Sequence, residues 1–120
     1  MSSASAEIGR RAEQAAAQHL LEAGLSLLAR NYSCRLGELD LVMQDSNQLV
    51  FVEVRYRGNN QFGSPLESIT PTKQRKLRAA ANVYLKQLSK QPSARFDAVG
   101  VSPSSKAGQE FNIVWCKNAF

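Results

Sequence analysis

Two apolar segments in the middle of the chain, separated by a short polar turn, constrain the fold more than any other feature. Residues 38–44 alternate between two faces, and residues 48–57 are dense in valine and phenylalanine, so both segments indicate β-strands. The Asp45-Ser46-Asn47 sequence between them is typical of a tight turn. Alternation puts Leu39, Leu41 and Met43 on one face of the first strand and Glu38, Asp40 and Val42 on the other. We therefore expect an antiparallel hairpin whose second strand is central in a sheet.

Helical segments lie on both sides of this hairpin. Residues 5–23 carry apolar side chains at a helical period and are followed by Gly24, which stops the helix. Thr70-Pro71 is typical of a helix start, and Pro92 is expected to end that second helix. Its apolar face comprises Leu77, Ala80, Ala81, Tyr84, Leu85 and Leu88. Further strands are expected at residues 25–32, 95–101 and 111–116, with a turn at 34–37 and a loop at 58–69. The order αβββαββ predicts an α+β or α/β fold with a mixed central sheet flanked by helices, and we take α/β as the expected class.

Length and composition indicate one small domain spanning residues 1–120. Of these residues 43% are hydrophobic and 21% are charged, which is typical of a globular chain. The longest apolar runs are far shorter than the roughly 18 residues that a membrane span needs, and the N-terminus lacks the features of a signal peptide. Two distant cysteines and a single histidine exclude CxxC and HExxH motifs. We therefore expect a soluble, cytoplasmic protein that does not bind membranes.

Positive charge is concentrated in one part of the chain. The formal net charge is +5, and the stretch from Arg55 to Arg95 holds nine basic residues but only one acidic residue, Glu67. Such an excess is typical of proteins that bind polyanions, although a solvated helix face has the same composition. The candidate contacts to a nucleic-acid backbone are Arg57, Lys73, Arg75, Lys76 and Arg78.

Two carboxylates interrupt the apolar strands of the hairpin. Pairing about the centre of the turn places Asp40 opposite Glu53, and Arg55 shares a strand face with Glu53. Two carboxylates about 5 Å apart repel by roughly 3 kcal/mol at an effective dielectric constant near 20. A proton, a cationic side chain or a metal ion must relieve this repulsion, and Mg²⁺ favours such oxygen ligands. The alternative is an ordinary acid on a solvated sheet face, paired with Arg55 or a lysine.

Six short motifs follow one another along the chain between Gly9 and Val101. They are Gly9-Arg-Arg-Ala-Glu13, Gly37-Glu-Leu-Asp40-Leu-Val, Phe51-Val-Glu53-Val-Arg55-Tyr-Arg57, Phe62-Gly63-Ser-Pro65, Thr72-Lys73 and Arg95-Phe96-Asp97. Their combination resembles the YraN-like family of uncharacterised bacterial proteins. That family is in turn similar to archaeal Holliday-junction resolvases and to the restriction-endonuclease-like fold with its PD-(D/E)xK site.

The resemblance implies a metal-dependent endonuclease that hydrolyses phosphodiester bonds. It implies Mg²⁺, or alternatively Mn²⁺, held by Asp40 and Glu53 with help from Glu13 and the backbone carbonyl of Val54. Branched or double-stranded DNA is the implied partner, and a homodimer is the implied assembly. On the residues alone, the favoured interpretation of Glu13 is an ordinary exposed helix charge paired with Arg10, and Glu38 is a candidate only for a supporting position.

One departure from the family pattern divides the functional hypotheses. The pattern has lysine where this chain has Arg55, which can stabilise developing negative charge but is a poor base. Lys73 then becomes the nearest candidate amine, provided that the preceding loop brings it close. The chain is therefore expected to be either a nuclease that uses Asp40, Glu53 and Arg55 as catalytic residues, or a module that binds nucleic acid without cutting it. A third hypothesis is an adaptor that binds an acidic protein through its basic helix or an exposed strand edge.

Overall fold

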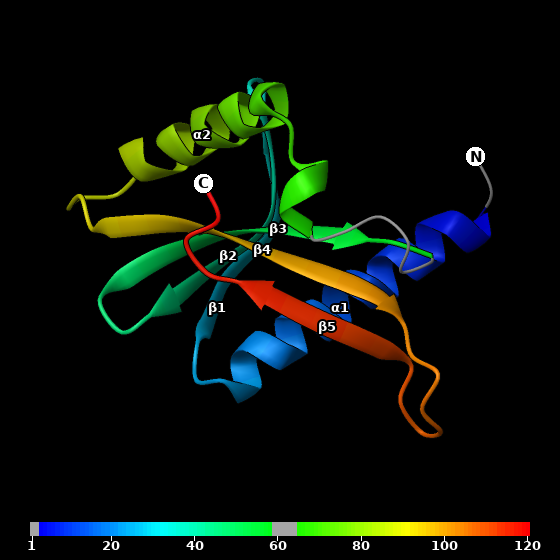
Figure 1. Ribbon diagram of the computed structural model, residues 1–120. Helices are drawn as coiled ribbons and strands as arrows, with labels where there is room; N and C mark the ends of the chain where they lie inside the picture. Colours follow the sequence, from blue (N-terminus) through cyan, green and yellow to red (C-terminus); the bar gives the residue numbers. More distant parts are fainter. Residues whose placement is uncertain (1–2, 59–64) are drawn as a thin grey trace.

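A computed structural model describes residues 3–58 and 65–120 of the chain, and Figure 1 shows a twisted sheet with a helix on each face. The elements, in chain order, are α1 (Ser3–Glu22), β1 (Ser26–Cys34), β2 (Gly37–Asp45), β3 (Gln48–Tyr56), the short 3₁₀ helix η1 (Pro65–Ser68), α2 (Pro71–Lys86), β4 (Ser93–Pro103) and β5 (Phe111–Cys116). Apart from η1, this is the order expected from the sequence.

The sheet is mixed, as expected. Its strand order is β1-β2-β3-β4-β5, and only the β3–β4 pair is parallel. A parallel pair requires a crossover, and η1 and α2 lie in that connection. The fold is α/β and agrees with a restriction-endonuclease-like αβββαββ arrangement.

Each helix covers its own face of the sheet with its own apolar core. The α1 core joins small helix residues to one face of the strands (Ala12, Ala16, Leu20, Leu41, Met43, Val50, Val52, Val99 and Val101). The α2 core lies on the other face (Leu39, Val42, Leu49, Phe51, Ile69, Leu77, Ala80, Ala81 and Ala98). Strand β3 contributes to both cores because it is buried on both faces, which confirms that it is central.

The hairpin has the expected register, but its alternation breaks at Asp40. The pairs run from Asp45↔Gln48 to Leu41↔Val52, so the next position sets Asp40 toward Glu53. Leu39, however, packs in the α2 core and not with Leu41 and Met43, which corrects the expected face assignment. The physical reason is that the Asp40 carboxylate replaces a regular ladder bond by accepting the Val54 N–H at 2.8 Å.

Several expected boundaries need correction. Helix α2 ends at Lys86 with Gln87 as its C-cap, so Pro92 does not end it, although Leu88 still packs against the α2 core. The turn expected at 34–37 is shorter, because β1 continues to Cys34 and β2 begins at Gly37. Within the expected loop at 58–69, residues 65–68 form η1. Residues 59–64, which include Phe62 and Gly63 of the family motif, lie outside the described residues.

Strand β2 begins directly beneath α2. A Cβ atom added at Gly37 would lie only 2.9 Å from the backbone carbonyl oxygen of Lys76 in α2. Glycine is the one residue that permits this approach without a shift of the helix backbone. The contact keeps the first turns of α2 close to the hairpin that carries the acidic residues.

Candidate active site

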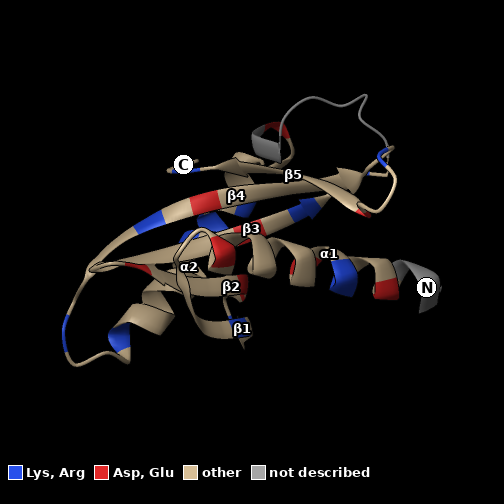
Figure 2. Cartoon of the chain, turned by 90° about the horizontal axis from the view of Figure 1, so that it is seen from below, with Lys and Arg blue, Asp and Glu red and all other residues tan. Residues whose placement is uncertain are grey.

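Asp40 and Glu53 come together on the hairpin, as the register predicts. Glu53 is 4% exposed and shares a side-chain hydrogen bond with Asp40. Burial, the negative charge of Asp40 and this hydrogen bond raise the pKa of Glu53 to about 7. Figure 2 shows that acidic positions occur on α1, β2 and β3, which are the elements that face this point. The structure therefore holds a pair of carboxyl groups that resists a second negative charge at neutral pH.

Two cationic side chains contact Glu53, and one of them comes from α2. The Oε2 atom of Glu53 lies 3.5 Å from an Nη atom of Arg55 and 3.4 Å from Nζ of Lys73. Strong charge-assisted bonds are shorter, at about 2.8 Å, so both ion pairs are loose. They lower the pKa of Glu53, but burial and Asp40 outweigh them. The pKa of Glu53 therefore stays raised although two cationic side chains lie beside it.

The first turn of α2 explains how Lys73 reaches the site. Thr70 caps the helix by accepting the backbone N–H of Lys73 at 3.2 Å, and Pro71 supplies the fixed φ angle that a first helical residue needs. The Nε atom of Arg55 donates to Ser68 Oγ in η1 at 3.0 Å. This segment thus satisfies the condition that the sequence left open, because the connection does bring Lys73 beside Glu53.

Glu13 faces the same region from α1. Its pKa is raised by burial first and then by the charges of Asp40 and Glu38, while a side-chain hydrogen bond with Asn31 lowers it. In the described part of the chain it forms no ion pair with Arg10, so it is not the simple paired surface charge of the alternative interpretation. Glu38 likewise acts on this region through its charge.

The acidic side chains around Glu53 offer a small set of oxygen ligands for a metal ion. Among residues 3–58 and 65–120, no group of three or more His, Cys, Asp or Glu side chains is gathered closely enough to hold one. Two carboxylates and water are nevertheless a common arrangement for Mg²⁺, which usually keeps several of its water ligands. The pair formed by Asp40 and Glu53 fits that pattern, with Val54 tied to Asp40 through its N–H.

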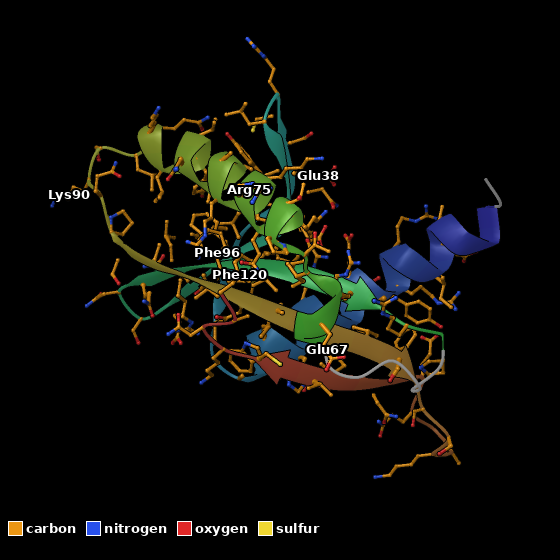
Figure 3. The ribbon with its side chains drawn as sticks, turned by 45° about the horizontal axis from the view of Figure 1, so that its top comes forward. Glu38, Glu67, Arg75, Lys90, Phe96 and Phe120 are labelled. Atoms are coloured by element: carbon orange, nitrogen blue, oxygen red, sulfur yellow. The ribbon has the colours of Figure 1, made fainter. Side chains whose placement is uncertain are left out.

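The basic residues expected to contact nucleic acid lie in three different surroundings. Arg57, Arg75 and Lys76 are exposed, whereas Lys73 forms an ion pair with Glu53. Arg78 stacks its guanidinium over the rings of Phe96 and Phe120, at 5.1 and 5.7 Å from their centroids. Figure 3 shows these two rings beside α2. Sequence reasoning missed this use of Arg78 because it depends on the path of the last residues of the chain.

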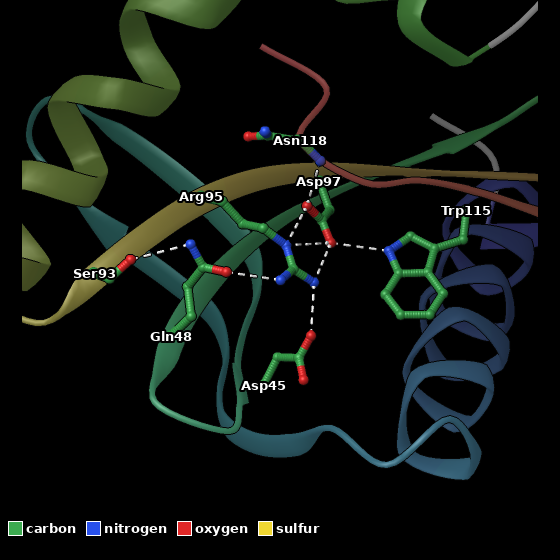
Figure 4. A network of polar contacts seen from close by, with 7 residues as sticks. All are labelled: Asp45, Gln48, Ser93, Arg95, Asp97, Trp115 and Asn118. Carbon is green, nitrogen blue, oxygen red and sulfur yellow. Dashed lines mark hydrogen bonds and ion pairs between the residues drawn. The ribbon is translucent and has the colours of Figure 1, made fainter.

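A second buried carboxylate, Asp97 on β4, has a different environment (Figure 4). It is 0% exposed and accepts hydrogen bonds from the Arg95 guanidinium, from Trp115 Nε1 at 2.9 Å and from the Asn118 backbone N–H at 2.9 Å. Arg95 also pairs with Asp45 at 3.1 Å. These contacts connect the hairpin turn, β4, β5 and the C-terminal residues. The Arg95-Phe96-Asp97 motif is thus built into the architecture of the sheet.

Comparisons with known proteins agree with the motifs. The model of "Uncharacterised protein family UPF0102" matches residues 12–101. A UPF0102 protein of Nitrosococcus oceani is 48% identical over 114 residues, covering 93% of this chain and 90% of the relative. One from Stutzerimonas stutzeri is 49% identical over 115 residues, covering 93% and 92%, and one from Psychromonas ingrahamii is 46% identical, covering 93% and 88%.

Neither helix of the described residues has the length and apolar character that a bilayer crossing requires.

The family match includes Glu13, Asp40, Glu53 and Lys73, so the whole candidate site lies within the matched segment. From the family model and from relatives that cover nearly the entire chain, this protein belongs to the UPF0102 family of uncharacterised bacterial proteins, the YraN-like family.

Proposed function

We propose that this protein is a metal-dependent endonuclease that hydrolyses phosphodiester bonds in DNA. The observation that carries the proposal is the buried Glu53 carboxyl beside Asp40, whose pKa stays raised although Arg55 and Lys73 form ion pairs with it. A divalent cation relieves the repulsion between these groups and requires no additional residue to reach the site. The expected ligands are Asp40, Glu53 and the carbonyl of Val54, with Glu13 in support and Mn²⁺ as a substitute for Mg²⁺.

A metal ion at this position would supply an activated water and neutralise negative charge on the phosphate. In the hydrolysis, the oxygen of water bonds to phosphorus, the bond from phosphorus to the leaving oxygen breaks, and a proton from the water is returned to that oxygen. The guanidinium group of Arg55 contributes positive charge toward the phosphate.

Lys73 supplies the amine that Arg55 cannot. Its Nζ lies 3.4 Å from Glu53 Oε2, and its side chain is 42% exposed, so it contacts Glu53 and is also accessible from solvent. An amine at that place can orient the attacking water and accept or donate a proton, which a guanidinium does poorly. We therefore assign the role of the lysine in the PD-(D/E)xK pattern to Lys73, which comes from a helix and not from β3.

The exposed basic residues would bind the phosphate backbone without reading bases. Arg57 follows β3, and Arg75 and Lys76 lie on the exposed side of α2. Such contacts give sequence-independent affinity that falls steeply with salt concentration. Branched or double-stranded DNA is the substrate class proposed, because both present closely spaced phosphates to such a surface.

Cleavage of labelled duplex and four-way-junction DNA by purified protein tests this proposal. Asp40→Asn and Glu53→Gln should each reduce Mg²⁺-dependent cleavage by about a hundredfold or more, and Lys73→Met should reduce it by a similar factor. Glu67→Gln is the matched control, because it removes an exposed carboxylate on η1 without touching the pair. Equal cleavage by the parent and by both acid variants would contradict the proposal.

The alternative is a nucleic-acid-binding module without cleavage, and the observation that favours it is Arg55 at the lysine position of the family pattern. In that case DNA binding weakens steeply with salt, and Mg²⁺ leaves the affinity unchanged. Arg55→Lys distinguishes the two functions, since cleavage that appears only in this variant indicates a binding module whose site is otherwise complete.

A further inference from the structure

The tight turn between β1 and β2 carries an exposed apolar side chain. Cys34 pairs with Gly37, so Arg35 and Leu36 form the turn. Leu36 is 53% exposed and belongs to neither apolar core of the described residues. Turns favour Gly, Asn, Asp, Pro and Ser, because those residues suit the turn backbone or bond to it. Neither turn chemistry nor core packing therefore explains a leucine at this position.

The same turn carries a cation without an acidic partner. Arg35 is exposed, and it forms no ion pair in the part of the chain that the structure describes. Glu38, the nearest acid in the sequence, acts through its charge on Glu13 of α1. Figure 3 shows the tip of this hairpin projecting past α2. The turn thus offers a guanidinium and an apolar side chain together at an accessible point.

A hollow lies between this turn and α2. Its volume is about 470 Å³, which is within the range of roughly 300–1,000 Å³ typical of small-molecule sites. It is lined by Cys34, Arg35, Leu36 and Val83, so three lining residues are apolar, one is cationic and none is acidic. A guanidinium stacks on aromatic rings and pairs with phosphate. This lining therefore suits a nucleotide, which joins a flat ring to a phosphate.

Both β2 and α2 lead from the acid pair to this hollow. Leu36 precedes Asp40 by four residues, which is about 13 Å along an extended strand. Lys73, Lys76 and Val83 lie along one side of α2, and that side faces the turn, because β2 begins against the backbone of Lys76. A length of 13 Å corresponds to about four stacked base pairs at 3.4 Å each. A DNA strand bound at the acid pair would therefore reach the hollow within a few nucleotides.

We propose that this hollow receives a nucleobase that has left its stack, with Leu36 as the apolar wedge and Arg35 as the cation that holds the nucleotide. The inference rests on the proposed nuclease function and narrows its substrate to DNA with a branch or an unpaired base. Apolar wedges separate neighbouring bases, and the separation costs least where a base is already unpaired. The protein should therefore prefer branched DNA to a continuous duplex.

Equilibrium binding to a labelled four-way junction and to a duplex of equal length tests the proposal, with EDTA present so that nothing is cut. The parent should bind the junction at least about tenfold more tightly than the duplex. Leu36→Ser should remove most of this preference and change duplex affinity by less than about twofold. Leu28→Ser is the matched control, because Leu28 is an exposed leucine (44%) on β1 that does not line the hollow, and it should keep the preference.

Alkylation of the two cysteines by a maleimide, followed by mass spectrometry, provides a measurement on the unaltered chain. Cys34 lines the hollow and Cys116 on β5 does not, while both are half-buried. Saturating junction DNA should slow the alkylation of Cys34 by at least about fivefold and change that of Cys116 by less than about twofold, because only Cys34 loses access to the reagent.

Equal binding of junction and duplex by the parent would overturn the inference. So would an unchanged preference in Leu36→Ser, or a Cys34 that stays unprotected in the DNA complex. Protection of Cys34 by a polyglutamate peptide and not by DNA would also overturn it, and would identify an acidic protein as the occupant. The nuclease proposal is decided separately, by whether Mg²⁺-dependent cleavage depends on Asp40 and Glu53, so either proposal can fail while the measurement of the other stands.

Discussion

Glu53 and Asp97 are both buried carboxylates, on the adjacent strands β3 and β4, yet their surroundings are opposite in character. Asp97 accepts hydrogen bonds from a guanidinium, an indole and a backbone amide. Glu53 has two loose ion pairs and a second carboxylate beside it. A buried acid with a full set of donors stabilises the fold, whereas a buried acid next to another acid awaits a proton or a cation. The number of donors thus distinguishes the two buried carboxylates more clearly than burial does.

The largest expected effect comes from removing the well-bonded acid. Asp97→Ala removes the acceptor of three hydrogen-bond donors, which are Arg95, Trp115 and the Asn118 backbone N–H, and leaves Arg95 with Asp45 as its remaining carboxylate partner. The free energy of unfolding should therefore fall by about 3–5 kcal/mol. Urea unfolding followed by circular dichroism measures this loss. Glu53→Gln serves as the comparison, because the same experiment at pH 8 should show no comparable loss. Equal destabilisation by both variants would contradict the distinction between the two acids.

The raised pKa of Glu53 predicts how stability depends on pH. The group has a pKa near 4.5 when unfolded and about 7 when folded, so the folded state binds the proton more tightly. Its contribution to stability is fully present below pH 4.5 and is lost as the pH rises through 7. The difference in unfolding free energy between the parent and Glu53→Gln should therefore change by about 2 kcal/mol between pH 5 and pH 8, to the disadvantage of the parent at pH 8. Unfolding curves of both proteins at the two pH values measure the effect, and parallel pH profiles would refute it.

A divalent cation should reverse that loss. At pH 8, Mg²⁺ at ten times its dissociation constant should stabilise the parent by about 1.4 kcal/mol. Thermal unfolding with and without Mg²⁺ measures this gain, which Asp40→Asn and Glu53→Gln should abolish and Glu67→Gln should retain. A shift of the same size in all four proteins would place the ion elsewhere.

The smallest effect concerns the outer part of the Asp97 network. Gln48 accepts a hydrogen bond from Arg95 at 2.8 Å, but Arg95 keeps both Asp45 and Asp97 without it. Gln48→Leu should therefore cost only about 1 kcal/mol in urea unfolding. A loss as large as that of Asp97→Ala would show that the network acts as a unit and not through its central carboxylate.

Features of the fold and of the candidate site can be predicted from the sequence when the residues that determine them lie close together in the chain. The approach of Asp40 to Glu53 followed from the turn alone, because the register of a hairpin is fixed by its loop. The face of Leu39 was predicted wrongly, since nothing in the alternation reveals that the Asp40 side chain bonds to Val54. A proline at position 92 suggested a helix end that the Gln87 cap places earlier.

Features that join distant segments were harder to see. The sequence places Lys73 among the basic residues and makes its approach to the site conditional on the preceding loop. Only the path through η1 and the Thr70 cap shows that it reaches Glu53. The stacking of Arg78 on Phe96 and Phe120 joins three separate elements, so no sequence spacing indicates it. The buried Asp97 likewise accepts hydrogen bonds from Trp115 and Asn118, which lie 18 and 21 residues further along the chain.

The most direct measurement is an NMR titration of the parent with Mg²⁺ at pH 8, observing side-chain carboxyl carbons and backbone amides. The Val54 amide reports on the site because it donates to Asp40. We predict saturable shifts of Val54, Asp40 and Glu53, with the carboxyl carbon of Asp97 and the indole N–H of Trp115 unchanged, and no such shifts at Val54 and Asp40 in Glu53→Gln. Signals of Val54, Asp40 and Glu53 that stay in place while Mg²⁺ saturates, or that move equally in the variant, would contradict a divalent-cation site at this carboxyl pair.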